Sequence, residues 1–91
     1  MSVHHDPAAR RFTVAVPSGT AELAYALAGP GVLDYYHTYV PLEDRGRGVA
    51  DRLAQAAVDY ARAQGLRIIP SCSYVAEWLR QHPEHADLVS A

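Results

Sequence analysis

The sequence predicts an α+β fold in which an antiparallel β-meander is followed by a β-α-β-α unit. Residues 11–40 hold three stretches with the two-residue period or β-branched and aromatic content typical of strands. Residues 47–64 change to a period of about 3.6, which is typical of an amphipathic helix. A short apolar stretch at 66–70 and a second helical pattern at 73–81 complete the unit.

The predicted meander occupies the first half of the chain. Residues 11–16 alternate in polarity, and residues 20–27 alternate again after the turn at 17–19, which predicts a hairpin. Residues 32–40 are largely apolar or aromatic on both faces, as expected of a central strand that is covered on both sides. Pro41 ends this strand because it has no N–H to donate. A helix separates the strand at 32–40 from the strand at 66–69, so these two strands are expected to run parallel.

Two amphipathic helices are predicted in the second half. The buried stripe of the first is expected to consist of Val49, Leu53, Ala56, Ala57, Tyr60 and Ala63. Gly65 is suited to follow its last turn, where a left-handed conformation is common. In the second helix the Ser73 hydroxyl is expected to cap the start, and Pro83 to stop the end. Its shared face is Tyr74, Val75, Trp78 and Leu79.

Length and composition predict one small cytoplasmic domain. We expect a flexible arm at residues 1–9 and a single domain at 10–91. The net charge of −2 argues against nucleic-acid binding. The single cysteine, Cys72, excludes an internal disulfide and fits a reducing compartment. No apolar stretch approaches the roughly 20 residues of a membrane span, and the N-terminus lacks the apolar core of a signal peptide.

A glycine- and arginine-rich turn lies between the third strand and the first helix. A helix N-terminus leaves N–H groups unpaired, and glycines let a phosphate approach them closely. A P-loop is excluded because the chain has no lysine, and the dinucleotide fingerprint lacks its third glycine. The pattern R-x-x-G-x-[GA] is met in full at residues 45–50. The alternative is a glycine-rich helix start that only makes a tight turn.

This hexad and its surroundings resemble the coenzyme A pyrophosphate loop of the GNAT acetyltransferase superfamily. H-T-x-V-P precedes it at 37–41, and P-x-C-x-Y-V-x-x-[WY]-L-x-x-H-P-E follows it at 70–84. Together these segments are similar to the short, single-domain branch of the superfamily, over residues 12–89. The resemblance implies a GNAT-like fold with a splayed central strand, acetyl-CoA as co-substrate, no metal, and acetyl transfer to an amine.

The resemblance also implies a coenzyme site at the end of the central strand. Backbone N–H groups of residues 45–50 would hold the pyrophosphate, and the pantetheine arm would pair with the strand edge at 37–40. The coenzyme-binding residues expected are Tyr39, Val40, Arg45, Gly46, Arg47, Gly48, Val49, Ala50, Arg52, Cys72 and Tyr74. For Arg47 and Arg52 the alternative is a solvated helix face. For Tyr74 it is an aromatic ring that faces the core.

Cys72 and His37 are the expected catalytic residues. Helix N-termini favour the thiolate, and the short GNAT branch carries a cysteine near the acyl sulfur. Covalent acetylation, proximity to the sulfur without reaction, and burial as a small hydrophobe all remain open for Cys72. His37 would deprotonate the amine, unless it is a core histidine bonded to a carbonyl; Glu43 is a second candidate base. Arg80 stands about where larger enzymes carry a tyrosine acid, which argues against that mechanism.

Two functions from different classes fit these patterns. The first is an acetyl-CoA-dependent N-acetyltransferase acting on an amine that the sequence does not identify. The second is a module that binds acetyl-CoA or CoA with little or no transfer. A plain interaction domain is a third. We expect a monomer or weak homodimer, and no metal. The adjacent His4 and His5 without a third ligand are weak evidence for a metal site, and His82 and His85 straddle Pro83 and would lack further ligands.

Overall fold

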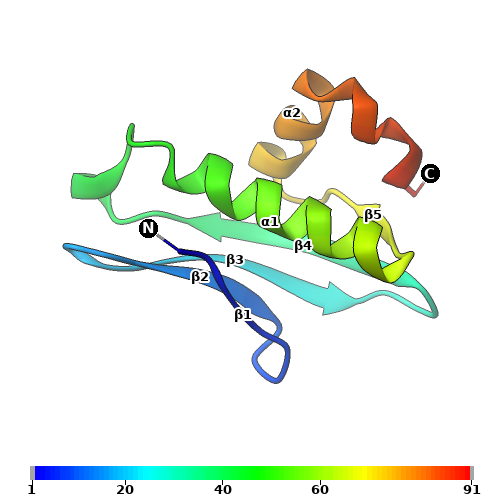
Figure 1. Ribbon diagram of the computed structural model, residues 1–91, viewed down its shortest axis with the longest axis horizontal. Coiled ribbons are helices and arrows are strands. Elements are labelled where there is room, and N and C mark those ends of the chain that lie inside the picture. Colours follow the sequence, from blue (N-terminus) through cyan, green and yellow to red (C-terminus); the bar gives the residue numbers. More distant parts are fainter. Residues whose placement is uncertain (1, 91) are drawn as a thin grey trace.

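The computed structural model describes residues 2–90 and has a sheet of five strands with a long helix across one face (Figure 1). The strands are β1 (His4–Asp6), β2 (Arg11–Val16), β3 (Gly19–Leu27), β4 (Val32–Tyr39) and β5 (Arg67–Ile69). Their order in the sheet is their order in the chain. Strands β1 to β4 pair antiparallel, and β5 pairs parallel with β4. The α+β class and the meander with one parallel return are therefore confirmed.

The helices occupy the second half of the chain. Helix α1 (Val49–Gln64) joins β4 to β5, and α2 (Ser73–Gln81) follows β5. Two short 3-10 segments, η1 (Leu42–Asp44) and η2 (Pro83–Leu88), precede α1 and follow α2. Gly65 caps α1 in the left-handed conformation, as its position predicts, with φ of 68°.

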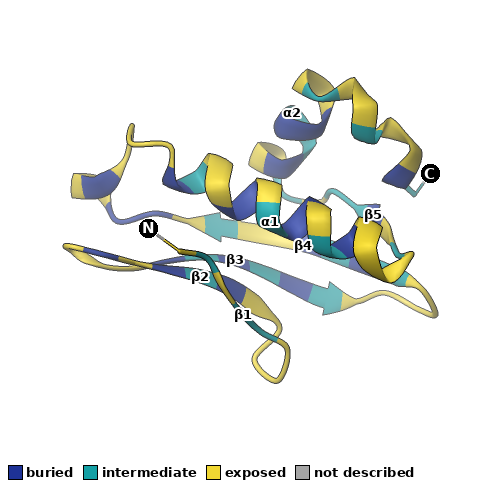
Figure 2. Ribbon diagram, in the orientation of Figure 1, coloured by how far each residue is buried: buried dark blue, intermediate teal, exposed yellow. Residues whose placement is uncertain are grey.

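The core lies between α1 and the strand face beneath it, called here the inner face (Figure 2). Phe12, Leu23 and Leu53 are fully buried there. The Tyr35 hydroxyl donates to the Ala57 carbonyl oxygen at 2.7 Å and links β4 to α1. Burial raises the pKa of Tyr35 well above its usual value of 10, so this donor keeps its proton.

The buried stripe of α1 is rotated from the predicted one. Val49, Leu53 and Ala57 are buried as predicted, but the remaining buried residues are Ala54, Val58 and Ala61. The predicted Ala56 and Tyr60 are half-buried and Ala63 is exposed. Alanines surround much of this helix, so the sequence alone does not fix which flank turns inward.

The N-terminal segment contains a strand that the sequence analysis did not predict. Strand β1 pairs with β2, with His5 opposite Phe12. The His5 ring stacks on Phe12 at 4.2 Å between centroids, and its Nε2 lies 2.7 Å from the Tyr25 hydroxyl. The aromatic packing of His5 therefore holds β1 against the sheet, although this segment has no obvious periodicity in the sequence. Residues 1 and 91, included in the predicted arm and domain, lie outside the described residues.

Strand β4 is covered on its inner face only, not on both faces as predicted. Leu33 and Tyr35 are buried, whereas Tyr36 is 52% exposed and His37 and Tyr39 are also exposed. The face opposite α1 is called here the outer face. The pairing with β3 shifts register at Ala24 and Tyr25, and Tyr36 falls between paired residues. This bulge changes which of the later side chains of β4 lie on the inner face and which lie on the outer face.

Helix α2 begins as predicted but with a different cap. Cys72 is the N-cap residue and makes no side-chain cap bond, while Ser73 is already the first helical residue. Val75, Trp78 and Leu79 are buried as predicted. Tyr74 is 37% exposed and does not belong to this face.

Candidate functional site

Strand β5 ends while β4 continues, and the two strands separate at that point. Their last paired residues are Asp34 and Ile69, after which β5 ends and β4 continues to Tyr39. The Cys72 N–H still reaches the Tyr35 carbonyl oxygen at 2.9 Å. Beyond that point the edge of β4 faces a gap instead of a strand. The splayed central strand expected from the resemblance is therefore present.

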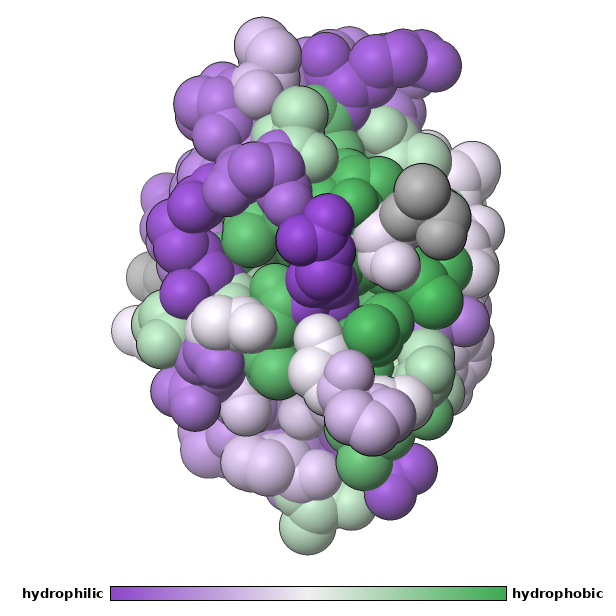
Figure 3. All heavy atoms as spheres, turned by 90° about the vertical axis from the view of Figure 1, so that its right-hand side faces the viewer, coloured by the Kyte–Doolittle hydropathy of each residue, from purple (hydrophilic) through white to green (hydrophobic). Residues whose placement is uncertain are grey.

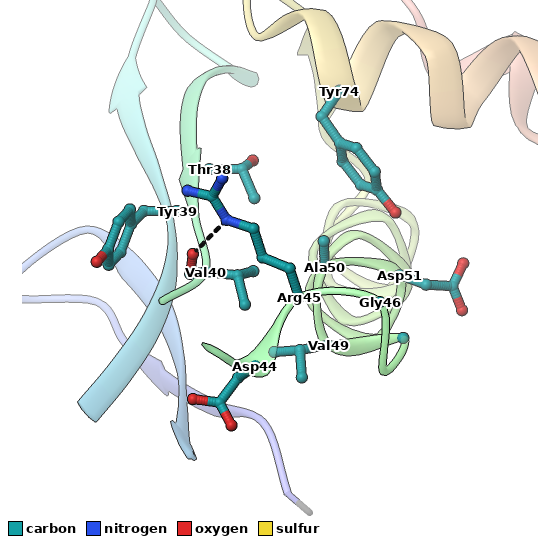
Figure 4. A pocket seen from close by; sticks show the side chains of 11 residues that line it. Thr38, Tyr39, Val40, Asp44, Arg45, Gly46, Val49, Ala50, Asp51 and Tyr74 are labelled. Carbon is teal, nitrogen blue, oxygen red and sulfur yellow. Dashed lines mark hydrogen bonds between the residues drawn. The ribbon is translucent and has the colours of Figure 1, made fainter. Parts of the chain in front are cut away.

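A cavity of about 370 Å³ lies at this splayed end (Figure 4). It is bounded by the end of β4, the loop before α1, the first turn of α1 and the start of α2. Its lining residues are Thr38, Tyr39, Val40, Asp44, Arg45, Gly46, Gly48, Val49, Ala50, Asp51 and Tyr74.

The loop at residues 45–50, called here the glycine loop, leaves open space above its backbone. Gly46 and Gly48 have φ of +82° and +77°, a left-handed conformation that favours glycine. A Cβ atom built at either residue would meet no other atom within 4 Å. Gly48 is also the N-cap of α1 and has no side chain to cap it. The first N–H groups of α1 thus remain available to an anion, with the partial positive charge of the helix behind them.

Arg45 fastens this loop to the end of β4. Its Nε donates to the Val40 carbonyl oxygen at 2.9 Å, and its guanidinium lies beside Thr38 and Val40 (Figure 4). The arginine therefore places a fixed positive charge at the cavity wall, where it suits a phosphate or a carbonyl oxygen.

Two acidic residues of the cavity wall were missed by the sequence analysis. Asp44 is only 2% exposed, and its Oδ2 accepts the Ser18 N–H at 3.2 Å, which ties the loop to the β2–β3 turn. Asp51 Oδ1 accepts the Trp78 Nε1–H at 2.7 Å. Figure 4 shows the Asp51 carboxylate turned away from Arg45. Both acids hold neighbouring segments together, a role that no local sequence pattern indicates.

Tyr74 lies in the cavity wall and not in the core, which corrects the alternative given for it. Its ring projects from the start of α2 toward Ala50 (Figure 4). Burial, and then the charge of Asp51, raise the pKa of Tyr74 above its usual value of 10. The phenol is therefore a proton-bearing donor at neutral pH.

Cys72 lies just behind the cavity. It is half-buried and packs against the core, and its Sγ is 3.4 Å from Oγ1 of Thr38, which does line the cavity. Thr38 falls within the strand edge at 37–40 that was expected to pair with the pantetheine arm, but it was not itself named as a site residue. The H-T-x-V-P segment contains it, but only the strand geometry shows that its side chain, and not that of His37, points inward.

His37 lies on the outer face and does not line the cavity. Its side chain is 51% exposed, and Nε2 is 3.8 Å from Glu22 Oε2. The alternative of a buried core histidine is therefore wrong. Arg47, Arg52 and Glu43 are exposed, and none of them lines the cavity. Of the expected coenzyme residues, those that line it are Tyr39, Val40, Arg45, Gly46, Gly48, Val49, Ala50 and Tyr74.

The described part of the chain contains neither a metal-binding cluster nor a helix suited to crossing a membrane. Within residues 2–90, no three or more His, Cys, Asp or Glu side chains are grouped so as to hold a metal ion. In the same range, neither α1 nor α2 has the length and apolar character that a membrane crossing needs.

Comparison with known proteins gives a consistent family assignment. The model of the GCN5-related N-acetyl-transferase family matches residues 11–88. Protein NATD1 of Bos taurus is 37% identical over 83 residues, which are 89% of this chain and 74% of that protein. Protein NATD1 of Gallus gallus is 35% identical over 85 residues, covering 91% and 77%.

A solved structure supports the fold. The NMR solution structure of a GCN5-like protein from Staphylococcus aureus aligns with a TM-score of 0.73 at 23% identity. The alignment covers 99% of this chain and 88% of that one. With the family match across most of the domain, the splayed strand and the glycine loop at its end, the chain belongs to the GCN5-related N-acetyltransferase family.

Proposed function

We propose that this protein is an acetyl-CoA-dependent N-acetyltransferase that acts on an amine. The observation that carries the proposal is the cavity where three features meet: the free edge of β4, the open glycine loop and the N-terminus of α1. The pyrophosphate of the coenzyme would bind the N–H groups of residues 45–50. The amide-rich pantetheine arm would run along β4 from Val40 toward Thr38.

This orientation brings the thioester toward Thr38 and Cys72. The neutral amine attacks the thioester carbonyl carbon, the carbon–sulfur bond breaks, and the amide forms. A backbone N–H near Tyr39 or Val40 would polarise the carbonyl oxygen. The leaving thiolate needs a proton, and Tyr74 is a protonated donor in the same cavity wall. Cys72 would lie beside the coenzyme sulfur, or accept the acetyl group itself as a thioester before the amine does.

His37 would serve as the base that takes the proton from the amine. It faces away from the cavity, so the proposal requires the amine to approach past the end of β4 from the outer face. Glu22 lies 3.8 Å from the His37 ring and would orient it or stabilise its charge. Arg47 and Arg52, exposed near the start of α1, would contact outer phosphates of the coenzyme.

The first experiment measures binding and turnover separately. Acetyl-CoA should raise the melting temperature, because a ligand that binds only the folded state stabilises it. Thiol release from acetyl-CoA should then increase with one or more members of an amine panel that includes peptides, polyamines and small metabolites. The absence of any stabilisation at millimolar acetyl-CoA would refute the proposal.

A module that binds acetyl-CoA with little transfer is the second candidate. One observation favours it: the cavity wall is made of residues suited to the coenzyme, and His37 is not part of it. Thermal stabilisation without thiol release for any amine would support this candidate over the first. The proposal also includes a cytoplasmic location and a monomer or weak homodimer, which fractionation and size-exclusion chromatography would test.

The role of Cys72 is decided by mass spectrometry. Incubation with acetyl-CoA should add about 42 Da to the intact chain if the thiol accepts the acetyl group, and the addition should be absent from Cys72→Ala. Equal turnover by that variant would restrict Cys72 to a position near the sulfur without a covalent step.

A further inference from the structure

The Thr38 hydroxyl lies between the cavity and the Cys72 thiol. Thr38 lines the cavity, and its Oγ1 is 3.4 Å from Cys72 Sγ. Thr38 is paired with Leu23, a fully buried residue of the inner face. The hydroxyl is thus a polar group in contact with both the cavity and the only sulfhydryl of the chain.

The β-bulge in β4 is what directs Thr38 inward. Tyr35 faces α1, so strict alternation would turn residue 37 inward and residue 38 outward. The register shift at Ala24 and Tyr25 leaves Tyr36 between paired residues and reverses that order. His37 consequently faces outward, opposite Ala24, while Thr38 reaches Cys72. Bulges beside functional sites commonly redirect a side chain in this manner.

We propose that Thr38 is a positioning residue that holds the Cys72 sulfur at the edge of the cavity by donating its hydroxyl hydrogen to it. This inference rests on the proposed function. The Cys72 main chain is fixed by its N–H bond to the Tyr35 carbonyl, but a cysteine side chain still has three staggered rotamers. Threonine is β-branched and stiff about χ1, so its hydroxyl is a well-aimed partner for one of them.

The hydroxyl is chemically separable from the shape of the residue. Valine matches threonine closely in shape and suits a strand, so Thr38→Val removes the donor and retains most of the packing. Serine keeps the donor and loses the methyl group. A packing role therefore predicts that valine is the better replacement, whereas a positioning role predicts serine.

The test compares iodoacetamide alkylation of Cys72 in Thr38→Val and Thr38→Ser at one neutral pH. The charged sulfur is the reactive form, and a lost donor destabilises it. Thr38→Val should react about tenfold more slowly than wild type, the equivalent of one lost hydrogen bond, and Thr38→Ser about as fast as wild type. Thr13→Val, on β2 away from the cavity, is the matched control and should change nothing.

Turnover gives a second, independent measure. Thr38→Val should lower kcat for acetyl transfer while the Kd for acetyl-CoA stays within about twofold, and Thr38→Ser should restore kcat. In a Cys72→Ala background, Thr38→Val should have no further effect if it acts through the sulfur.

The inference is overturned if Thr38→Val alkylates as fast as wild type, or if serine fails to restore the rate. If Thr38→Val does not fold, Thr38→Ala replaces it. A wild-type protein that neither binds nor consumes acetyl-CoA would refute the proposed function alone, since the alkylation comparison requires no coenzyme.

Discussion

The two faces of β4 differ in how they are built. On the inner face, Thr38 points into a cavity whose lining residues are mostly glycines and residues with short side chains. On the outer face, His37 projects from an open sheet next to the Arg11–Glu22 ion pair, together with the exposed ring of Tyr39, a residue that also contributes to the cavity lining. Under the proposed function, backbone geometry holds the donor and exposed side chains meet the acceptor. Under that proposal the fold would determine the donor, and exposed side chains of the outer face would determine the acceptor.

The strongest test of the inner face changes Gly48. Gly48→Val should weaken acetyl-CoA binding by about 100-fold or more, because a side chain would fill the space over the loop and strain its left-handed backbone. Isothermal titration measures the affinity. Gly31→Val is a matched control, since Gly31 has φ of +73° and equally open surroundings but lies in the β3–β4 turn. Both variants should lose similar stability, and an equal loss of affinity in both would contradict the loop assignment.

The corresponding test of the outer face changes His37. His37→Gln should lower kcat by about 100-fold, the usual contribution of a general base, without weakening acetyl-CoA binding. Steady-state kinetics with the best amine of the panel would measure it. His4→Gln, an exposed histidine on β1, is the control and should leave kcat unchanged. Full activity in His37→Gln would mean that the outer face takes no part in proton removal.

A smaller effect is expected where α2 contacts the cavity. Trp78→Phe removes the Nε1–H group that donates to Asp51. It should lower the free energy of unfolding by about 1.5–3 kcal/mol because the acceptor is charged. The released carboxylate should also repel the coenzyme phosphates, weakening binding by roughly threefold to tenfold. Tyr35→Phe removes a buried hydrogen bond to α1 outside the cavity wall. It should lower the free energy of unfolding by about 1 kcal/mol and leave the affinity for acetyl-CoA unchanged. Equal affinities in both variants would show that Asp51 is electrostatically silent.

The sequence predicted the elements better than the directions of their side chains. Alternation located β2 and β3, and the glycine at 65 located the end of α1. Nothing in the local pattern of residues 32–40 indicates a bulge, because it arises from pairing with β3. That one irregularity turns the side chain of Thr38, and not that of His37, toward the cavity.

Long-range contacts account for the other differences. Strand β1 was missed because its signal is an aromatic contact of His5 with Phe12, seven residues later in the chain and visible only across the hairpin. Asp44 and Asp51 contribute to the cavity through partners far along the chain, Ser18 and Trp78. The loop at 45–50, by contrast, is a local motif in which spacing and chemistry coincide, so its place at the cavity could be predicted from the sequence, while its binding of the donor stays a proposal.

The smallest predicted effect concerns the far end of the inner face, where β1 docks through His5. Burial lowers the pKa of His5 from its usual 6.5. The neighbouring Asp6 opposes this shift and His4 adds to it, while burial raises the pKa of the facing Tyr25 hydroxyl, which is therefore uncharged at neutral pH; the ring of Tyr60 also faces His5. Below about pH 6.5 the unfolded chain therefore binds a proton more readily than the folded one, so stability is full above that pH and falls as the pH decreases through it. The urea midpoint should fall more between pH 7.5 and pH 5.5 for wild type than for His5→Phe. This variant keeps the ring contact with Phe12 but has no group that titrates in this range. The urea midpoint of His4→Gln should fall nearly as much as that of wild type. If His5→Phe loses as much as wild type, the acid sensitivity of this fold arises from other groups, and β1 is held by its backbone pairing instead of by the neutral imidazole.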